Sequence, residues 1–421
     1  MKKVLLISYY FPPRPGVASN RTGGLAKFLP QFGWEPLILT PKLRAGTWPS
    51  YARVIETEGS SSVDAFKQRA GIKDKNEQLQ SNTMLFGFAK TIGKGLFREI
   101  VCYPDEHKSM IPSSMKIGEQ VINDENIEAI ISSASPVSTH IAASRLAARA
   151  GLPWIADFRD LWTQSHNYKY TAIRHCLESR LEKQTMRSAH ALVTVSEPLA
   201  VKLRVLHQQP PVFSITNGFD PDEIRTADKA SPKFTITYTG QIYAGKQDPS
   251  LLFAAIQNLT KTGALSGDNL AVDFYGPYSE VLSNTIRQFG LEDIVRQHGI
   301  VDRLTAIEKQ RESSVLLLLN WNDPAEEGIY TGKIFEYLAA RRPILAFGGK
   351  GGVVAELLDQ TRTGVFIYDS ETLSKLLLAW YGEFTRTGWV GYEPKNEMVQ
   401  QYSQVTMAQK FAVLLNGVSN S

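Results

Sequence analysis

Short apolar runs alternate with helical patterns along most of this chain, and that alternation constrains the fold more than any other feature. Helical patterns at 138–150 and 171–189 separate the last three runs of the first half. Buried strands separated by helices indicate a parallel sheet with crossover helices. The apolar runs of this half are KVLLISYYF at 3–11, EPLILTP at 35–41, IEAIISSA at 127–134, PWIADF at 153–158 and ALVTVS at 191–196.

The same alternation restarts after residues 214–224. A helix is predicted over 248–262, and a helix-to-strand pattern follows at 351–368. The division falls near 205–232, where the chain is polar and contains proline. We therefore expect an α/β protein with two doubly wound halves and a ligand cleft between them, at the carboxyl ends of their strands. The predicted strands of this half are 234–240, 270–276, 314–320 and 342–349.

Composition excludes several classes of function. The chain has 421 residues, enough for about two to three domains. Its net charge of +4 is too mild to indicate nucleic-acid binding. Cys102 and Cys176 form no CxxC spacing, and the seven histidines form no HxH or HExxH spacing, so we predict no metal site.

The apolar N-terminal run stops at Pro12 and is read as a strand rather than a signal peptide. No run reaches the roughly 18 apolar residues of a membrane span.

One segment, TMLFGFAKTIGKGLFREIVCY at 83–103, differs from the rest of the chain. Its apolar residues are interleaved with Lys90, Lys94 and Arg98. This pattern fits an interfacial membrane helix. The favoured interpretation is a helix that docks on the first domain and leaves a basic face in water. The sequence leaves both alternatives open.

Glu336 lies among apolar residues in GKIFEYLAA, on a helix expected to begin near Gly332 with Thr331 as its cap. Lys333 and Glu336 then lie on one face of that helix. The carboxylate either pairs with Lys333 or accepts hydrogen bonds from a vicinal diol such as a ribose. Spacing alone does not separate these two roles.

Two glycine-containing turns follow predicted strands. YTGQIYAGK contains Gly240, Gly245 and Lys246, and a lysine after such a turn can neutralise a phosphate. PPRPG opens a helix, and Gly16 there would let a diphosphate approach the helix N-terminus. Neither GxGxxG nor GxxxxGK[ST] is present, which disfavours a nicotinamide site and a P-loop.

ADFRDLW ends another strand and brings together Asp157, Arg159 and Asp160. Charges at this position form either a structural Asp–Arg pair or part of a site, and their place at the end of a strand favours a site.

These motifs together resemble the family 4 glycosyltransferases of GT-B fold. GKIFEYLAARRPILA is similar to the donor-site motif of that family, and TGQIYAGK to its strand–turn–Lys element. YYFPPRPG resembles its N-terminal glycine loop, and VTVSEPL with ITNGFD its interdomain passage. ADFRDLW is typical of a bacterial subgroup linked to surface-polysaccharide assembly. The resemblance covers nearly the whole chain, with the motifs in the family's order.

The resemblance implies two Rossmann-like domains that face an interdomain cleft. Residues 1–210 would form the acceptor-side domain and 211–400 the nucleotide-sugar-binding domain, with a helix at 401–421 crossing back to the first. The reaction would move a sugar from a UDP- or GDP-linked donor to an acceptor hydroxyl with retention of configuration. It would need no metal and no other cofactor.

The resemblance also implies roles for single residues. Glu336 would hold the nucleotide ribose, Lys246 the diphosphate, and Gly16 would lie against the phosphates. The implied catalytic residues are Lys246, Arg159 and Asp157. The other residues implied for the donor are Gly240, Gln241, Lys333 and the backbone amides of Ile329, Tyr330 and Thr331. Apart from the resemblance, the sequence offers Asp105, His107, His140 and Asp160 as acceptor-side candidates, although a lone histidine is more often structural than catalytic.

Three positions depart from the family pattern. Gly328 stands where the first motif glutamate is usual, with Glu327 one position away. Gln241 replaces a phosphate-binding arginine. Arg159 replaces a histidine, and an electrostatic role suits it better than acid–base work because arginine stays protonated.

We therefore expect a glycosyltransferase that acts on a glycan or lipid-linked glycan, in bacterial polysaccharide or glycolipid assembly. The protein would be cytoplasmic and peripheral at the inner face of the membrane through residues 83–103. Two alternatives remain. One is a nucleotide-sugar epimerase or hydrolase of the same fold. The other is an inactive donor-binding partner subunit, which Gln241 and Gly328 favour.

Overall fold

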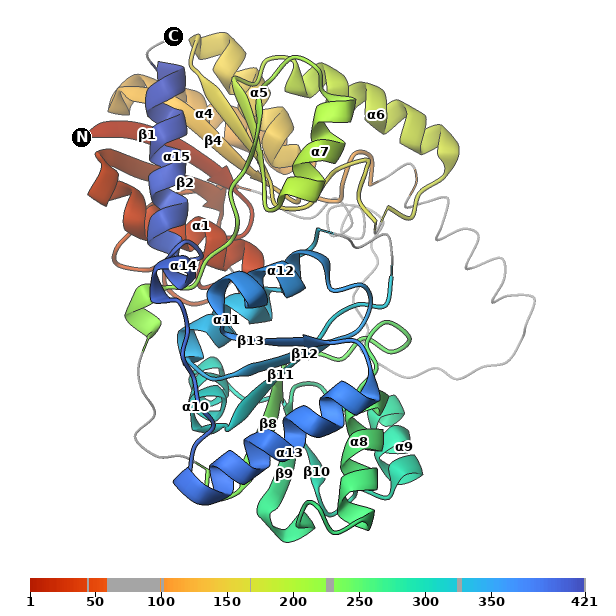
Figure 1. The fold of residues 1–421 in the computed structure, drawn as a ribbon. Helices are drawn as coiled ribbons and strands as arrows, with labels where there is room; N and C mark the ends of the chain where they lie inside the picture. The colour runs from red at the N-terminus through yellow and green to blue at the C-terminus, as the bar shows by residue number, and fades with distance from the viewer. Residues whose placement is uncertain are drawn as a thin grey trace. The chain divides into compact units, whose positions relative to one another are not determined.

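The computed structural model describes residues 1–43, 45–58, 99, 102–166, 168–224, 231–323 and 328–419 (Figure 1). The chain divides into two compact units: unit 1 is Met1–Thr216 with Met407–Ser421, and unit 2 is Asn217–Thr406. The sequence predicted these divisions at 210 and 400. Glu327 and nearly all of the segment 83–103 lie outside the described residues, so the predictions made for them stay predictions.

Unit 1 is built on a parallel sheet, which in the described part of the chain has the order β3-β2-β1-β4-β5-β6-β7. In the central strand β1, Leu5 pairs with Leu37 of β2 on one side and with Ile130 of β4 on the other. Burial on both faces explains the continuous apolar runs of the central strands. The strands are β1 (Lys2–Ser8), β2 (Trp34–Pro41), β3 (Arg53–Thr57), β4 (Ile127–Ala134), β5 (Trp154–Phe158), β6 (Ala191–Thr194) and β7 (Val212–Ser214).

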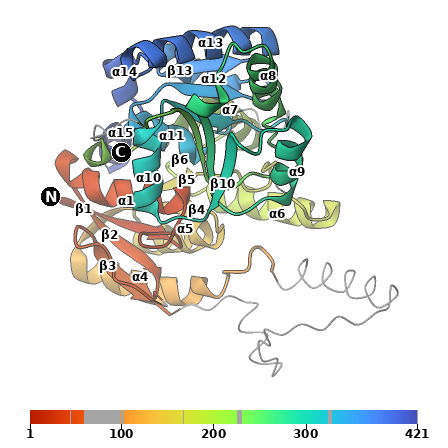
Figure 2. The same ribbon diagram turned by 90° about the horizontal axis from the view of Figure 1, so that it is seen from below.

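Helices cover both faces of the unit 1 sheet (Figures 1 and 2). One face packs on α4 (Met110–Glu125), α5 (Ser138–Ala150), α6 (Ala172–Met186) and α7 (Glu197–Leu206) around one apolar cluster. The other face carries α1 (Val17–Phe28), followed by a short 3-10 turn at Leu29–Phe32, and α15 (Gln404–Ser419). Arg21 of α1 lies 5.3 Å from the ring centroid of Phe411, and Trp34 donates to Asn416 at 3.1 Å. Residues after Met407 therefore complete unit 1.

Unit 2 repeats the design with a parallel sheet whose described order is β10-β9-β8-β11-β12-β13. Odd and even residues of β11 point to opposite faces, so Leu317 and Leu318 enter different cores. The strands are β8 (Phe234–Thr239), β9 (Leu270–Tyr275), β10 (Val295–Gly299), β11 (Val315–Leu319), β12 (Ile344–Phe347) and β13 (Gly364–Ile367).

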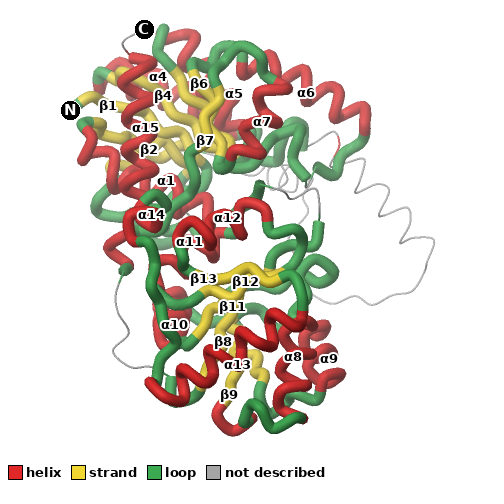
Figure 3. Tube along the Cα trace, in the orientation of Figure 1, coloured by secondary structure: helices red, strands yellow, loops and turns green. Residues whose placement is uncertain are grey.

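The helices of unit 2 also form two layers, which Figure 3 distinguishes from strands and loops. One core packs against α8 (Ser250–Lys261), α9 (Glu280–Phe289) and α13 (Ser370–Thr387). The opposite core packs against α11 (Gly332–Ala340), α12 (Gly352–Thr361) and α14 (Asn396–Gln400). The helix α10 (Arg303–Glu312) precedes β11, and short 3-10 turns occur at Pro221–Glu223 and Gly267–Asn269.

The two predicted parallel sheets are confirmed. The strand at 127–134 and the helix at 138–150 have the predicted bounds. The first strand ends at Ser8 rather than at residue 11, and residues 9–11 begin the loop that leads to α1. The sequence did not predict β3, β7 or β10. No helix in the described part of the chain is long and apolar enough to span a bilayer.

Candidate functional site

The turn after β8 is held tightly against the neighbouring strand β9. Gly240 has φ +107 and its N–H donates to Tyr275 O at 2.7 Å. A Cβ added to Gly276 would lie 2.2 Å from Gly240 O, so a side chain is excluded there. Lys333 of α11 lies over Gly240, and its Cε is 2.6 Å from the position that a Cβ on Gly240 would take. Glycine is therefore required at position 240 in the turn and at position 276 after β9. The Lys333 side chain reaches from α11 to the end of β8.

Lys246 lies beside Trp321, with its Nζ 3.9 Å from the ring centroid. Tyr243 packs on the same indole, with 5.2 Å between the ring centroids. The N–H of Asn322 donates to Lys246 O at 2.9 Å, and Gln247 donates to Leu319 O at 2.7 Å. These contacts fix the 240–247 turn to the carboxyl end of β11. A cation is thus held at the edge of the unit 2 sheet where parallel α/β folds bind ligands.

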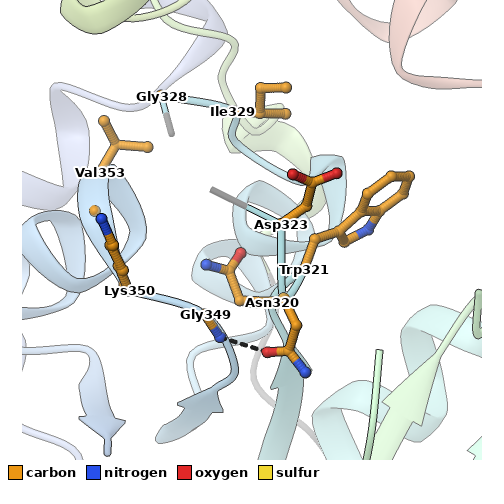
Figure 4. A pocket seen from close by; sticks show the side chains of 11 residues that line it. Asn320, Trp321, Asp323, Gly328, Ile329, Gly349, Lys350 and Val353 are labelled. Carbon is orange, nitrogen blue, oxygen red and sulfur yellow. Dashed lines mark hydrogen bonds between the residues drawn. The ribbon is translucent and has the colours of Figure 1, made fainter. Parts of the chain in front are cut away.

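A pocket of about 120 Å³ opens at the same edge, between the ends of β11 and β12 (Figure 4). Figure 4 shows Lys350 and Val353 across the pocket from Asp323 and Trp321. Asn322 Oδ1 accepts from Gly349 N at 2.6 Å. The residues that line it are Asn320, Trp321, Asn322, Asp323, Gly328, Ile329, Gly349, Lys350, Gly351, Gly352 and Val353.

The glycine-rich loop at 348–352 is required by close packing against the residues after β11. A Cβ on Gly348 would lie 2.6 Å from Asn320 O, and a Cβ on Gly349 would lie 2.4 Å from Trp321 O. Both glycines also have positive φ values. This loop and Asn320 were not among the site residues predicted from the sequence. The signal was available, because polar residues directly follow the buried strand SVLLLLN and GGKGG joins a strand to a helix.

Glu336 is half-buried on α11. Gln310 Nε2 lies 3.5 Å from its Oε2, and no ion pair joins it to Lys333 or to another described residue. Burial raises the pKa of Glu336, while the positive charge of Arg303 acts in the opposite direction. Burial lowers the pKa of Lys333, whose Nζ lies 5.1 Å from the Tyr238 ring centroid. The structure thus does not contain the Lys333–Glu336 pair that spacing alone allowed.

The segment 328–331 leads from the pocket directly into α11. Gly328 and Ile329 line the pocket. Tyr330 packs on Phe335 with 5.7 Å between ring centroids, and burial raises its pKa. Thr331 occupies the N-cap position of α11, but its side chain makes no capping hydrogen bond, so the predicted cap is wrong in that respect. Gln241 is exposed in the turn after β8.

In unit 1, Asp157 is fully buried in an ion pair with Arg21 of α1. Arg21 Nη2 lies 2.7 Å from Asp157 Oδ1, and both side chains are 0% exposed. Ser133 Oγ donates to Asp157 Oδ2 at 2.9 Å and accepts from Arg159 Nε at 3.0 Å. This geometry favours the structural Asp–Arg pair that the sequence left open, with Arg21 rather than Arg159 as the partner. The pairing could not be predicted, because the two residues are 136 positions apart.

Arg159 is half-buried at the carboxyl end of β5. Its Nη2 donates to Ser135 O at 2.6 Å, and its guanidinium lies 5.9 Å from the Tyr10 ring centroid. Together with the bond to Ser133, these contacts hold the cation at the strand end. Asp160 beside it is exposed.

The acceptor-side candidates lie in different environments. Asp105 accepts from Ser138 N and from His107 N, both at 2.7 Å, so it caps the start of α5. The His107 ring lies 4.0 Å from that of Tyr9. His140 is fully buried and bonded through Nδ1 to Ser132 Oγ at 2.7 Å. Burial lowers its pKa to about 3, so it is neutral near pH 7. The environment of His140 is that of a structural residue.

Gly16 immediately precedes α1 with φ +113 and is exposed. No atom lies within 4 Å of the position that a Cβ would take. The backbone is therefore open to a ligand at this point. Among the residues that the structure describes, no group of three or more His, Cys, Asp or Glu could hold a metal ion.

Comparison with known proteins gives the fold of the chain. No family model and no curated protein matches the sequence. Solved structures do match: sucrose-phosphate synthase from Thermosynechococcus elongatus has a TM-score of 0.60 at 13% identity, covering 99% of both chains. HepE from Anabaena, in complex with UDP and glucose, has a TM-score of 0.59 at 14% identity and covers 99% of this chain and 100% of its own. WaaG, a glycosyltransferase involved in lipopolysaccharide biosynthesis, has a TM-score of 0.53 at 12% identity, covering 99% and 100%. The chain has the GT-B fold of these proteins.

Proposed function

We propose that this protein is a retaining glycosyltransferase that moves a sugar from a nucleotide-diphosphate-sugar to an acceptor hydroxyl. The observation that carries the proposal is Glu336, a half-buried side chain whose carboxylate has no ion pair with any described residue. It lies on the helix that directly follows the segment 328–331, which begins in the pocket. A charged carboxylate in such a position needs hydrogen-bond donors. The two hydroxyls of a nucleotide ribose would supply them.

The residues around Glu336 suit the rest of such a donor. Lys246 would neutralise the diphosphate, and the backbone amides of Ile329, Tyr330 and Thr331 would face the phosphate and sugar. The pocket is also lined by Ile329. There the side-chain amide of Asn320 and the backbone of the glycine-rich loop at 348–352 could bind the hydroxyl groups of a sugar. UDP and glucose in the HepE complex support a UDP-linked donor, and a GDP-linked donor remains within the proposal.

The proposed mechanism depends on charge stabilisation. As the sugar leaves, negative charge grows on the diphosphate, and preorganised cations and N–H donors there lower the barrier. Lys246, supported on Trp321, is the cation of unit 2 placed for this work. In unit 1, Arg159 would act electrostatically near the reacting sugar, and the open backbone at Gly16 would lie against the phosphates. No metal ion and no further cofactor take part in this scheme.

The proposed setting is bacterial surface-polysaccharide or glycolipid assembly, with a glycan or a lipid-linked glycan as acceptor. The likeness of the fold to WaaG and the ADFRDLW motif support this setting. The enzyme would then work at the inner face of the membrane, and the prediction that residues 83–103 contact it stays part of the proposal.

Product analysis tests the proposal. The protein is incubated with UDP- and GDP-sugars, with and without glycan and lipid-linked acceptors. We expect nucleotide release and a new glycosidic product only when an acceptor is present. A changed sugar nucleotide without acceptor would indicate an epimerase, and free sugar alone would indicate a hydrolase. Donor binding without turnover across the acceptor panel would indicate the inactive partner subunit.

A further inference from the structure

The helix α6 contains three basic residues and two glutamates, and the fold buries both glutamates together with Arg174. Glu178 accepts from Arg174 Nε at 2.6 Å and from Trp162 Nε1 at 3.0 Å. Glu182 accepts from Thr163 N at 3.0 Å and lies 3.2 Å from His207 Nε2. The two glutamates are only 1% and 0% exposed. Neither carboxylate therefore offsets the cations on the outer face of the helix.

Three cations remain on that outer face. Arg180, Lys183 and Arg187 are exposed, and none of them pairs with an acidic residue in the described part of the chain. Their spacing of three and four places them on one side of the helix. They line an open groove of about 680 Å³ together with the end of α7 and the loop to β7. No acidic residue is found among the described residues that line this groove, so it is strongly positive.

Exposed aliphatic side chains extend the same surface. Ile173 and Leu177 of α6 are 77% and 54% exposed, and they lie seven and three residues before Arg180 on the same side of the helix. Val205 of α7 lines the groove and is 74% exposed. Aliphatic groups beside unpaired cations form the pattern of a surface that enters the boundary between headgroups and acyl chains.

Helix electrostatics explains only part of this pattern. Cations near the C-terminus of α6 interact favourably with the helix dipole, but the dipole gives no reason to expose Ile173 and Leu177. A soluble polyanion would also use the cations and would leave the aliphatic side chains in water.

We propose that the α6–α7 surface docks on a lipid bilayer with anionic headgroups. This surface is defined by Ile173, Leu177, Arg180, Lys183, Arg187 and Val205. Its guanidinium and ammonium groups would contact lipid phosphates while the aliphatic side chains insert beneath them. The inference depends neither on glycosyl transfer nor on residues 83–103.

Vesicle co-sedimentation of the full chain tests this docking. Vesicles of equal parts phosphatidylcholine and phosphatidylglycerol are compared with phosphatidylcholine alone. We expect binding to the anionic vesicles and weaker binding as salt is raised. The triple variant Arg180→Gln, Lys183→Gln, Arg187→Gln should bind about a hundredfold more weakly, since each basic side chain near such a surface contributes about a fivefold factor.

A matched control separates this surface from net charge. Lys261, Arg287 and Lys410 are exposed on other helices, and changing all three to Gln removes the same charge. That variant should bind like the wild type. A second variant, Ile173→Ser, Leu177→Ser, Val205→Ser, should also lose vesicle binding while its binding to inorganic polyphosphate is unchanged. Circular dichroism melting checks that all variants fold, which is expected because every change is at the surface.

Several results would overturn the proposal. The α6 triple variant could bind vesicles as well as the wild type, or the matched control could lose as much binding. Binding could disappear only when Lys90, Lys94 and Arg98 are changed to Gln, which would assign the contact to that segment. A wild-type protein that binds polyphosphate and ignores anionic vesicles would make the groove a polyanion site instead.

Discussion

At the scale of single residues, Glu336 is the group on which the proposed donor site depends most. The fold buries part of this side chain, and within the described residues its carboxylate has a single long contact, with Gln310. Burial raises its pKa, so the folded state holds a proton at this site more tightly than the unfolded chain does. This difference in pKa adds to the free energy of unfolding. The contribution is complete below the ordinary pKa of the unfolded chain and is lost as the pH rises through the raised pKa of the folded state.

The change Glu336→Gln should therefore separate binding from stability. Nucleotide affinity should fall by at least tenfold, because charge-assisted hydrogen bonds of about 1.5–3 kcal/mol each are lost. The wild type should lose stability as the pH is raised from 4.5 to 8, because its carboxyl then becomes charged in a partly buried site, whereas Gln has no charge to bury. The melting temperature of the variant minus that of the wild type should therefore increase over this range. Calorimetry and thermal melts over this pH range measure both effects. Unchanged affinity would remove Glu336 from the ribose site.

Lys246 allows a kinetic prediction. The change Lys246→Ala should lower kcat/KM about 10²–10³-fold, the usual cost of removing one group that stabilises developing charge. Lys246→Arg should restore activity only in part, because the two cations differ in shape. Lys261→Ala, at the exposed C-terminal end of α8, serves as the control and should have a small effect. Steady-state kinetics with near-normal turnover in the Lys246→Ala enzyme would exclude Lys246 from the mechanism.

Local patterns identify some residues of the candidate site and cannot identify the contacts of others. Lys246, Glu336 and the segment 328–331 follow predicted strands or begin a predicted helix, and the structure keeps them at one edge of the unit 2 sheet. The partner of Asp157 depends on a contact between α1 and β5 that no local pattern encodes. The burial of Glu178 and Glu182 likewise depends on Trp162, Thr163 and His207, which lie outside α6.

At the scale of elements, the sequence predicted every central strand of the two sheets and one edge strand, β13. The missed strands are β3, β7 and β10, all at or beside a sheet edge. RVIET in β3 and VRQHG in β10 carry charged and polar residues. Charged side chains are common on edge strands because they discourage pairing with other chains. An apolar run is therefore a good signal for central strands and a poor one for edge strands that carry charged or polar residues.

The Arg21–Asp157 pair gives a prediction about how elements are joined. The change Asp157→Asn leaves the Arg21 charge buried without its partner, which should lower the free energy of unfolding by about 3–5 kcal/mol. The double change Arg21→Met, Asp157→Leu should recover much of that loss. Asp160→Asn, on the exposed neighbour, is the matched control and should change stability by less than about 0.5 kcal/mol. Urea denaturation measures all three, and equal stability of Asp157→Asn and the wild type would contradict the structural role.

At the scale of the whole molecule, the two units differ in how the chain builds them. Both apolar cores of unit 2 are formed by residues between Phe219 and Tyr402. Unit 1 uses Met407, Phe411 and Leu415, which are 2%, 0% and 0% exposed, from the far end of the described chain. Each such side chain contributes about 1.5–3 kcal/mol when buried, which together is a large part of the 5–15 kcal/mol typical of a domain.

Separate expression of the two segments tests this difference. The segment 217–406 should fold by itself, with a cooperative thermal transition and dispersed amide signals. The segment 1–216 should be unfolded or aggregated, and adding a peptide of residues 404–419 should restore helical content and a transition. A stable 1–216 segment without the peptide would show that α15 contributes little to unit 1.

The placement of unit 2 inside the sequence of unit 1 has a consequence for synthesis on the ribosome. Roughly 190 residues of unit 2 separate Thr216 from Met407. At about 5–20 residues per second, the helix that completes unit 1 would emerge about ten to forty seconds after the rest of that unit. During that interval the nascent chain exposes the apolar face that α15 later covers. Unit 2, made without interruption, can fold first, although it is second in the sequence.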